Sequence, residues 1–203
     1  MNEVTVAGRK LQHFHIAAFF RSREEEYEVL RSYIKEGIDA GEKTVHICDP
    51  SLKHDHLQHL ETMGVPITDC TRTGQLEVLG WNDAYLKEGR FDGDTMMALL
   101  EEVVTTSRAE GFSRVRMMGH MEWVLEDRPG VTLDRVIDYE LRVNQLLNRL
   151  QQPAICVYDL NRFSGAAVIE VLRAHPFAII GGVLHENPFY DPPEGLLGSA
   201  VNR

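Results

Sequence analysis

The sequence has few cysteines and no CxxC pair. Its 203 residues include three cysteines, Cys48, Cys70 and Cys156, which are odd in number and far apart. Such a set argues against a disulfide framework, which needs paired cysteines, and against a zinc ribbon, which needs closely spaced pairs. Reduced cysteines are typical of the cytoplasm, so we expect a cytoplasmic protein.

Long hydrophobic runs are absent as well. A transmembrane helix needs about 18 or more consecutive apolar residues, and no segment of the chain has them. The opening segment, MNEVTVAGRK, has no apolar core of signal-peptide length. We therefore expect neither secretion nor a membrane as partner.

Positive charge is scarce and scattered. The chain has 21 lysines and arginines against 31 aspartates and glutamates, which gives a formal net charge of −10 and a pI of about 5.3. An acidic surface repels the phosphates of nucleic acids, and no cluster of basic residues interrupts it. Nucleic acid is therefore not an expected partner.

Glycine is missing where a nucleotide-binding protein needs it. Residues 19–27, FFRSREEEY, join a predicted strand to a predicted helix without glycines to wrap a phosphate or a lysine to bind it. No GxxxxGKS/T or GxGxxG motif occurs elsewhere, and Gly119-His120 stands where a Walker B strand would end in a carboxylate. We expect no ATP hydrolysis. Ser22 is instead expected to cap the helix that follows, which has three glutamates in its first turn.

What the sequence does have is an alternation of strand and helix patterns. Short apolar runs alternate with longer segments whose apolar residues recur every three or four positions. This alternation predicts an α/β fold of three layers, with a mostly parallel sheet between helices on both faces. Strands are predicted at 11–20, 43–50, 65–70, 75–80, 113–123, 153–159 and 177–184, and helices at 23–42, 51–64, 94–111, 131–150 and 161–175.

The chain is expected to form one domain. It shows no internal repeat, no low-complexity run and no change in composition that would mark a linker. We predict a single domain over residues 1–203, with a core from about 11 to 185 and an irregular tail at 186–203. Three prolines in the tail prevent regular structure there.

Polar and aromatic side chains follow the predicted strands. The carboxyl ends of parallel strands share one edge, where ligands bind in open α/β sheets. Methionine and aromatic residues near this edge are typical of an apolar pocket with polar groups at its mouth, although Met117 and Tyr158 are expected in the core. The residues nominated for a ligand site are Arg21, Arg23, Asp49, His120, Glu122, Trp123, Asp159, Arg162 and Phe163.

Nine histidines raise a metal hypothesis. His13 and His15 alternate along a predicted strand and face one side, where two imidazoles could share a zinc or iron ion. A third ligand is not evident, and no HxxxH or CxxC motif supports one. We predict no metal and no cofactor, with His13 and His15 as the candidates if a metal binds. His54, His56 and His59 are expected on a solvated helix face.

No catalytic nucleophile stands out. The sequence has no GxSxG elbow, and Ser164 lies at a predicted helix start, where it is expected to cap. Cys48 and Cys156 lie in apolar strands, where a thiol packs as a small hydrophobic group. We therefore expect a protein that is not an enzyme.

Several segments, taken together and in order, resemble one known family. They are an opening His-x-x-x-Phe/Tyr strand, an xEGxxAGE helix end, a Tyr-Leu-x-x-GRFD segment, a Cys-x-Tyr-Asp strand and an HP…NPxY ending. Over residues 11–193, their order and spacing are similar to those of the MEDS domain, named for methanogens, methylotrophs and a dichloromethane-responsive regulator. No single motif would suffice alone.

The resemblance implies a cytoplasmic sensory domain with a RecA-like, P-loop-NTPase-like fold that lacks the Walker A motif. Such domains are proposed to sense small hydrocarbon derivatives, and they are often joined to a kinase, an anti-sigma module or a DNA-binding domain. A chain of 203 residues leaves no room for such a module, so we expect one of three arrangements. The chain signals through a partner such as a kinase or an anti-sigma factor, binds a ligand without signalling, or is a domain of a longer protein. A homo-oligomer is expected by analogy with RecA-like relatives.

The resemblance also places individual residues. Arg90 and Phe91, in the GRFD segment, join the nominated ligand site. At least half of the matched positions are expected to be structural, for example glycines in turns and prolines at strand starts. The other matched residues are His13, Phe19, Tyr85, Gly89, Asp92, Cys156, Tyr158, Asp159, His175, Pro176, Asn187, Pro188 and Tyr190.

Three functions are consistent with these observations. The leading prediction is a non-catalytic sensory domain that binds a small organic ligand at the carboxyl edge of the sheet and signals through a partner protein. The alternative is an interaction module of a kinase or anti-sigma pathway, in which acidic faces dock the partner and the pocket is vestigial. The third is a residual nucleotide-binding protein or metal-dependent hydrolase, which would depend on His13, His120 or Glu122.

Overall fold

The computed structural model describes residues 3–192 of the chain. Of the tail predicted at 186–203, residues 187–192 form turns and coil after the last strand, and the remainder lies outside the described residues. Within 3–192, no helix is long and apolar enough to cross a membrane.

The centre of the molecule is a seven-stranded sheet in the order β5-β4-β6-β7-β3-β8-β9. Neighbouring strands are parallel except β8 and β9, which form an antiparallel edge. The strands are β3 Phe14–Phe20, β4 Lys43–Cys48, β5 Leu76–Gly80, β6 Val115–His120, β7 Pro153–Asp159, β8 Phe177–Ile180 and β9 Val183–Glu186.

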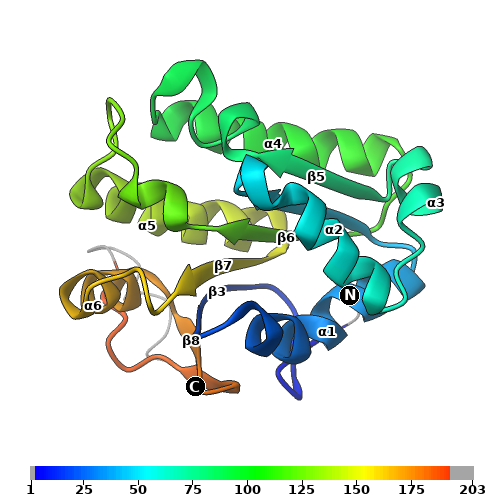
Figure 1. Cartoon of the computed structure of the whole chain (residues 1–203), viewed down its shortest axis with the longest axis horizontal. Helices are drawn as coiled ribbons and strands as arrows, with labels where there is room; N and C mark the ends of the chain where they lie inside the picture. The colour runs from blue at the N-terminus through cyan, green and yellow to red at the C-terminus, as the bar shows by residue number, and fades with distance from the viewer. Residues whose placement is uncertain (1–2, 193–203) are drawn as a thin grey trace.

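Helices cover both faces of this sheet, which gives three layers (Figure 1). Helices α4, α5 and α6 pack on one face, and α1, α2 and α3 pack on the other together with a hairpin of β1 and β2. This is the predicted α/β architecture. The helices are α1 Arg23–Asp39, α2 Lys53–Thr62, α3 Ile67–Arg72, α4 Gly93–Ala109, α5 Leu133–Leu150 and α6 Gly165–Ala174, the short 3-10 helices are η1 Pro50–Leu52, η2 Trp81–Asp83, η3 Lys87–Gly89 and η4 Glu122–Leu125, and the hairpin strands are β1 Val4–Val6 and β2 Arg9–Leu11.

Burial along β3 explains why the sheet lies between two helical layers. All seven of its residues are buried. Ala17 and Phe19 join the apolar cluster under α4, α5 and α6, whereas Ile16 and Ala18 join the cluster under α1, α2 and α3. A strand that is buried on both faces has a continuous apolar run rather than an alternating pattern, as the sequence shows here.

Two of the predicted strands differ in the structure. Residues 65–70, predicted as a strand, lead into helix α3, and Pro66 takes its N-cap position. A short apolar run suits either element, and proline suits the start of a helix because the first amides have no intrahelical partner. The predicted strand at 177–184 is the β8–β9 hairpin, because Gly181 and Gly182 both take positive φ and close a tight turn.

Helix α1 ends against a buried ionic cluster. Glu42 accepts from Nη1 of Arg114 at 3.1 Å and from Nε of Arg116 at 2.6 Å, and all three side chains are buried. Arg116 also donates to the carbonyl oxygen of Tyr33 at 2.5 Å. A Cβ on Gly37 would stand 2.6 Å from the Cδ and Nε atoms of Arg116. The glycine is therefore required by the close approach of the arginine.

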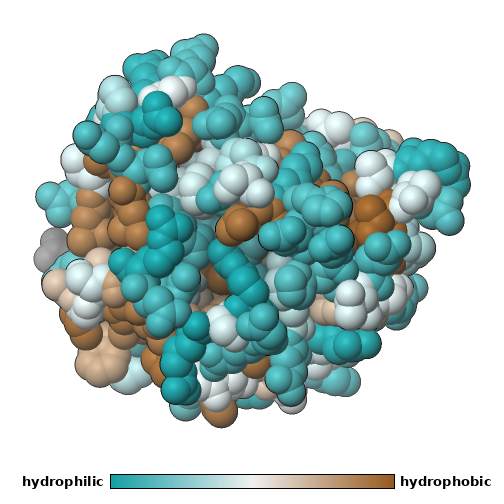
Figure 2. Space-filling view, viewed as in Figure 1, coloured by the Kyte–Doolittle hydropathy of each residue, from teal (hydrophilic) through white to brown (hydrophobic). Residues whose placement is uncertain are grey.

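The surface is mostly hydrophilic, with hydrophobic residues in small groups on the face that Figure 2 shows. This agrees with a formal net charge of −10. Two of the exposed large apolar side chains, Ile180 and Val183, flank the turn of the β8–β9 hairpin. The β8–β9 hairpin, at the outer edge of the sheet, therefore presents apolar as well as polar groups to solvent.

Candidate functional site

The turn between β3 and α1 occupies the place where a phosphate loop would lie. The Ser22 hydroxyl accepts a hydrogen bond from the Glu25 amide at 3.3 Å, and the Glu25 carboxylate accepts from the Arg21 amide at 2.8 Å. Together these bonds satisfy free amides at the helix start. The predicted Ser22 cap is confirmed.

A buried ionic network lies behind this turn at the carboxyl edge of the sheet. Glu26 accepts from Nη1 of Arg23 at 2.6 Å and from Nε2 of His120 at 2.7 Å. A second buried carboxylate, that of Glu122, lies 3.5 Å from Nη2 of Arg23. The charges compensate one another, as buried ions must. The cavity beside Arg23 and Glu26 measures about 30 Å³, which leaves room for little more than a water molecule.

Three hydrogen-bonded side chains extend this network toward α2. Nδ1 of His46 and Nε2 of His56 are 2.8 Å apart, and Nδ1 of His56 contacts the Tyr27 hydroxyl. Both imidazoles are buried. The expectation of a solvated helix face was wrong for His56, because this face of α2 packs on β4. It holds for His54, which is exposed.

The surroundings of these histidines set their protonation. Burial lowers the pKa of His46 to about 3 and the pKa of His56 well below its ordinary value, so both imidazoles are neutral. Burial alone would also lower the pKa of His120, but the Glu26 carboxylate outweighs it and raises this pKa to about 9. Burial would raise the pKa of Glu26, yet His120 and Arg23 keep it below its ordinary value. The pair is therefore ionised at neutral pH.

The His120–Glu26 pair predicts a stability that falls as the pH rises. Folding raises the pKa of His120 from 6.5 to about 9, so between these values the folded chain holds a proton that the unfolded chain has released. The contribution to the free energy of unfolding is complete below pH 6.5 and is lost toward pH 9, by about 1.4 kcal/mol per pH unit. Urea denaturation at several pH values between about 7.5 and 8.5 measures this slope.

His120→Gln should flatten the slope, because it removes the titrating group but keeps a hydrogen-bond donor for Glu26. His15, His46 and His56 have lowered pKa values in the folded chain, so they oppose this slope near pH 7, where their unfolded imidazoles are still about a quarter protonated. Above about pH 7.5 they contribute little. His54→Gln removes an exposed histidine of α2 and is the control, with the slope of the wild type. An equal slope in His120→Gln would contradict the assignment.

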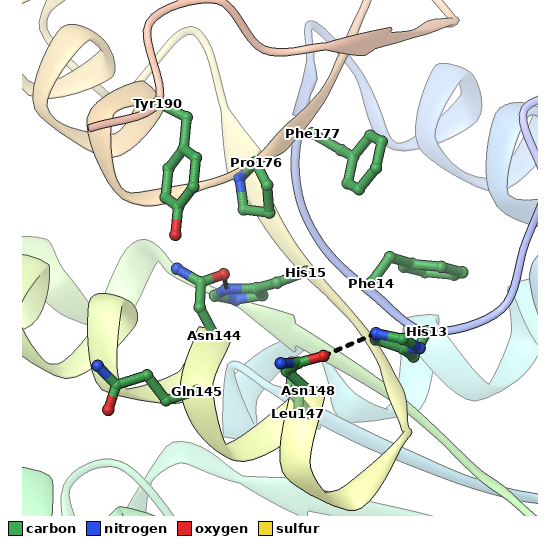
Figure 3. A pocket seen from close by; sticks show the side chains of 10 residues that line it. All are labelled: His13, Phe14, His15, Asn144, Gln145, Leu147, Asn148, Pro176, Phe177 and Tyr190. Carbon is green, nitrogen blue, oxygen red and sulfur yellow. Dashed lines mark hydrogen bonds between the residues drawn. The ribbon is translucent and has the colours of Figure 1, made fainter. Parts of the chain in front are cut away.

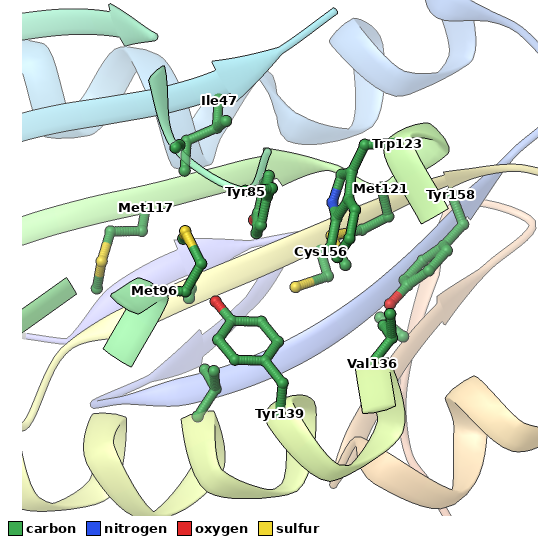
Figure 4. Packing of buried hydrophobic residues seen from close by; sticks show 14 of the residues in the cluster. Ile47, Tyr85, Met96, Met117, Met121, Trp123, Val136, Tyr139, Cys156 and Tyr158 are labelled. Atoms are coloured by element: carbon green, nitrogen blue, oxygen red, sulfur yellow. The ribbon is translucent and has the colours of Figure 1, made fainter. Parts of the chain in front are cut away.

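Three aromatic residues nominated for the ligand site lie in the core. Trp123 has no exposed surface, and its ring stacks on Tyr85 with the centroids 4.6 Å apart (Figure 4). The Phe91 ring lies 4.7 Å from the Trp123 ring. Phe163 is also buried and packs edge-on against Tyr158 at 5.2 Å. Trp123 and Phe163 therefore fill the apolar core. Phe91 is buried as well but borders a cavity of about 280 Å³ that charged residues of α4 and α5 line.

The remaining nominated residues are not gathered into one pocket. Asp49 and Asp159 each accept a hydrogen bond from the backbone amide two residues further on, at 2.8 and 2.9 Å. These bonds shape the chain as it leaves the strands. The carboxyl edge therefore brings together Arg23, His120 and Glu122 from the nominated set. The nominated arginines that stay exposed are Arg21, Arg90 and Arg162.

A larger cavity lies at the opposite edge of the sheet, beside the amino ends of β3 and β8 and against α5 (Figure 3). Its volume is about 250 Å³. No aspartate, glutamate, lysine or arginine is among the ten residues that line it. The apolar part of the wall is Phe14, Leu147, Pro176, Phe177 and Tyr190, and the polar part is His13, His15, Asn144, Gln145 and Asn148.

Two polar side chains on the wall of this cavity are accessible to solvent. Among the described residues, the Gln145 amide and the Tyr190 hydroxyl make no hydrogen bond, and Figure 3 shows the Tyr190 hydroxyl pointing toward Asn144. Asn148 is engaged, because its Oδ1 atom lies 2.9 Å from Nε2 of His13. An apolar wall with a few unsatisfied polar groups is typical of a small-molecule site.

His15 lines this cavity and also belongs to a group of four potential metal ligands in the core. They come from β3, α5, β7 and the residue after α6, and all are buried. Their donor atoms lie within 4.8 Å of one another. The sequence offered no third ligand for the histidine pair, whereas the fold supplies one from each of three distant segments. We refer to His15, Glu140, Cys156 and His175 as the His-Glu-Cys-His cluster.

The distances inside the cluster are short. Nε2 of His15 lies 3.1 Å from Oε2 of Glu140 and 3.3 Å from Sγ of Cys156. The same carboxylate oxygen lies 3.5 Å from Nε2 of His175 and 3.6 Å from Sγ of Cys156. Burial raises the pKa of the Cys156 thiol well above its ordinary value. A thiol that keeps its proton is a poor nucleophile.

Most of the chain matches the model of one known family. The family model MEDS, described as MEthanogen/methylotroph, DcmR Sensory domain, matches residues 14–176. The chain is a member of the MEDS family. This MEDS chain is also 26% identical over 173 residues to the transcriptional repressor DcmR of Methylorubrum extorquens. The match covers 84% of this chain and 61% of the repressor, so the chain spans about three-fifths of its relative's length.

The fold of this MEDS domain is similar to that of a KaiC-like protein from Pyrococcus horikoshii. The TM-score is 0.59 at 12% identity, over 85% of this chain and 73% of that chain. At such low identity the likeness speaks for the fold alone. It confirms the RecA-like fold that the family resemblance implied.

The opening MEDS motif needs one correction. Three residues separate His15 from Phe19, so the spacing His-x-x-x-Phe fits His15 rather than His13. His13 lies outside the His-Glu-Cys-His cluster, where it bonds to Asn148. The resemblance already contained two other members of the cluster, Cys156 and His175, although no role was derived for them.

One carboxylate of the Arg23–His120 network, that of Glu26, and the carboxylate of the His-Glu-Cys-His cluster were not nominated from the sequence. Glu26 was noted only as one of three glutamates in the first helical turn, and Glu140 was not singled out. The helical period did contain a signal, because Glu140 stands four residues after Val136 and three before Val143, both of which are buried. A carboxylate on the buried face of a helix needs partners, and this could have identified it.

Proposed function

We propose that this MEDS chain is a non-catalytic sensory domain that binds a small, uncharged organic molecule in the cavity at the amino ends of β3 and β8. The observation that carries the proposal is the composition of that cavity. It measures about 250 Å³, it has aromatic walls and amide and imidazole groups, and no charged side chain lines it. Such a cavity suits a ligand with an apolar body and one or two hydrogen-bonding groups.

The family supports a regulatory role. MEDS is described as a sensory domain, and the relative DcmR is a transcriptional repressor. We propose that ligand binding is passed to a partner protein, such as a kinase or an anti-sigma factor. Tyr190 follows the last strand, and Asn144 and Asn148 stand on α5. A ligand that contacts all three would hold the C-terminal segment against this helix.

The carboxyl edge is the second candidate location. Arg23 is already paired with Glu26 and Glu122 there, and the cavity beside it measures about 30 Å³. An incoming anion would compete with two carboxylates for one guanidinium, and burying their charge unpaired would be costly. The geometry therefore favours the amino edge and an uncharged ligand.

A binding screen with matched variants tests the proposal. Short alcohols, aldehydes, ketones and halogenated alkanes are titrated onto the protein and followed by thermal shift and by NMR. Gln145→Trp places a bulky side chain at the cavity wall and should weaken binding at least 10-fold. Gln58→Trp makes the same exchange on the exposed face of α2 and should bind as the wild type does.

Arg162→Ala distinguishes the two locations. This exposed arginine follows β7 at the carboxyl edge, so the variant should retain full affinity if the amino-edge cavity is the site. Loss of binding in Arg162→Ala with retention in Gln145→Trp would move the site to the carboxyl edge. If no compound binds the wild type, the sensory proposal fails and the interaction module becomes the better account.

A further inference from the structure

The hydrogen atoms on both imidazoles of the His-Glu-Cys-His cluster are directed away from its centre. Nδ1 of His175 donates to the carbonyl oxygen of Val171 at 2.8 Å. Nδ1 of His15 lies 2.9 Å from Oδ1 of Asn144, and Nδ2 of Asn144 donates to the carbonyl oxygen of Ala174 at 2.6 Å. This second bond fixes the amide, so its oxygen accepts from His15. In the neutral rings both Nε2 atoms therefore carry lone pairs.

These lone pairs meet further acceptors. Both Nε2 atoms face the carboxylate of Glu140, and the thiol of Cys156 has a single hydrogen to share among them. Nε2 of His175 has no hydrogen-bond partner within residues 3–192, and its side chain is fully buried. An unpaired buried acceptor is costly. A cation at the centre would satisfy all four groups at once.

The spacing of the donor atoms agrees with one particular coordination. Bond lengths of about 2.0–2.3 Å to nitrogen, oxygen and sulfur give a tetrahedron whose edges measure roughly 3.3–3.6 Å. Four edges of the cluster measure 3.1, 3.3, 3.5 and 3.6 Å. Four of the six edges are thus close to those of the tetrahedron, and the other two, from His175 to His15 and to Cys156, are no longer than 4.8 Å. Imidazole, thiolate and carboxylate together suit zinc better than magnesium or calcium, which prefer oxygen ligands alone.

We propose that the His-Glu-Cys-His cluster binds one zinc ion in a closed, tetrahedral site. Each of the four side chains supplies one donor atom, and the thiol of Cys156 releases its proton to solvent as the thiolate binds. No position remains for water, so the site is structural rather than catalytic. The ion would join β3, α5 and β7 to the end of α6. The metal site does not depend on the ligand proposal, because metal content is measured without a ligand.

The wild-type protein provides the deciding measurement. The full chain is stripped with a chelator and titrated with Co²⁺ and then with Zn²⁺. We expect one zinc per chain by elemental analysis, tetrahedral d–d bands with Co²⁺, and a thiolate-to-cobalt charge-transfer band that one equivalent of Zn²⁺ removes. A folded wild-type chain without the thiolate band, or with no stoichiometric zinc, would overturn the proposal and leave a shared proton in the cluster.

Variants then assign the ligands. Cys156→Ser should abolish the thiolate band, whereas Cys70→Ser, which alters a buried thiol of α3, should keep it. Cys48→Ser combined with Cys70→Ser leaves Cys156 as the only thiol and should also keep it. Asn144→Ala removes the outer hydrogen bond to His15 but no ligand, so Zn²⁺ affinity should fall roughly 10–100-fold with the band retained. A band that survives Cys156→Ser would overturn the assignment.

Discussion

Glu42→Ala should lower the free energy of unfolding by about 3–5 kcal/mol, because it leaves two buried guanidinium groups without their carboxylate. Glu42 binds Arg114 at 3.1 Å and Arg116 at 2.6 Å, and the exposed fraction of each of the three side chains is below one-tenth. In the low-dielectric interior an uncompensated cation costs far more than at the surface. Urea denaturation of the wild type and the variant at neutral pH measures the difference.

The matched control is Glu77→Ala. Glu77 also pairs with a cation, since its carboxylate lies 3.5 Å from Nζ of Lys43, but 42% of its side chain is exposed. Lys43 is buried, but Oε2 of Glu110 lies 3.1 Å from its Nζ and still pairs with it when Glu77 is removed. Loss of the half-exposed Glu77 carboxylate should therefore cost less than about 1 kcal/mol. Equal losses in Glu42→Ala and Glu77→Ala would show that burial of the Glu42 cluster adds nothing to its strength.

One segment of the MEDS pattern has a structural role at the end of α1. The segment xEGxxAGE contains Gly37, Gly41 and Glu42, and the structure gives each a packing role. Gly37 makes room for Arg116, Gly41 takes a positive φ at the end of α1, and Glu42 pairs with the arginines. This part of the MEDS pattern therefore maintains the fold rather than a ligand site.

The fold could be predicted from the sequence because each strand and helix leaves a pattern within its own residues. Buried strands and amphipathic helices leave periodic patterns over short stretches, and their alternation specifies a parallel sheet with helical layers. The errors arose where local signals compete. The run at 177–184 reads as one strand, whereas Gly181 and Gly182 divide it into a hairpin. The β1–β2 hairpin was missed because its strands have three residues each, too few to show an alternating pattern.

The two buried networks were harder to predict from the sequence, because their residues are far apart in it. His15 meets a cysteine 141 residues later, and no spacing rule relates two such positions. Glu140 lies between them on a helix whose face becomes buried only when α5 packs on the sheet. The rule that ligands bind at the carboxyl edge named His120 and Glu122 correctly as neighbours of Arg23. It could not foresee that these groups would compensate one another.

Trp123→Ala should lower the free energy of unfolding by about 3–5 kcal/mol, the usual cost of emptying a large buried aromatic site. Trp123 has no exposed surface and contacts the rings of Tyr85 and Phe91, with centroids 4.6 and 4.7 Å away. The cavity cannot collapse easily, because Tyr85 and Phe91 are themselves buried and both pack against Tyr139 of α5. Urea denaturation followed by circular dichroism suits the measurement, since Trp81 remains and would complicate fluorescence.

Trp123→Phe is the companion variant. It keeps an aromatic ring between Tyr85 and Phe91, so it should lose roughly half as much stability as Trp123→Ala. The two variants also distinguish a role of Trp123 in core packing from a role in ligand binding. If Trp123 lined a ligand pocket, as its position after β6 suggested, Trp123→Ala would abolish ligand binding and leave the free energy of unfolding nearly unchanged. A large loss of stability shared by both variants in this ratio places Trp123 in the core, and ligand binding is then better tested through Gln145, whose side chain is exposed.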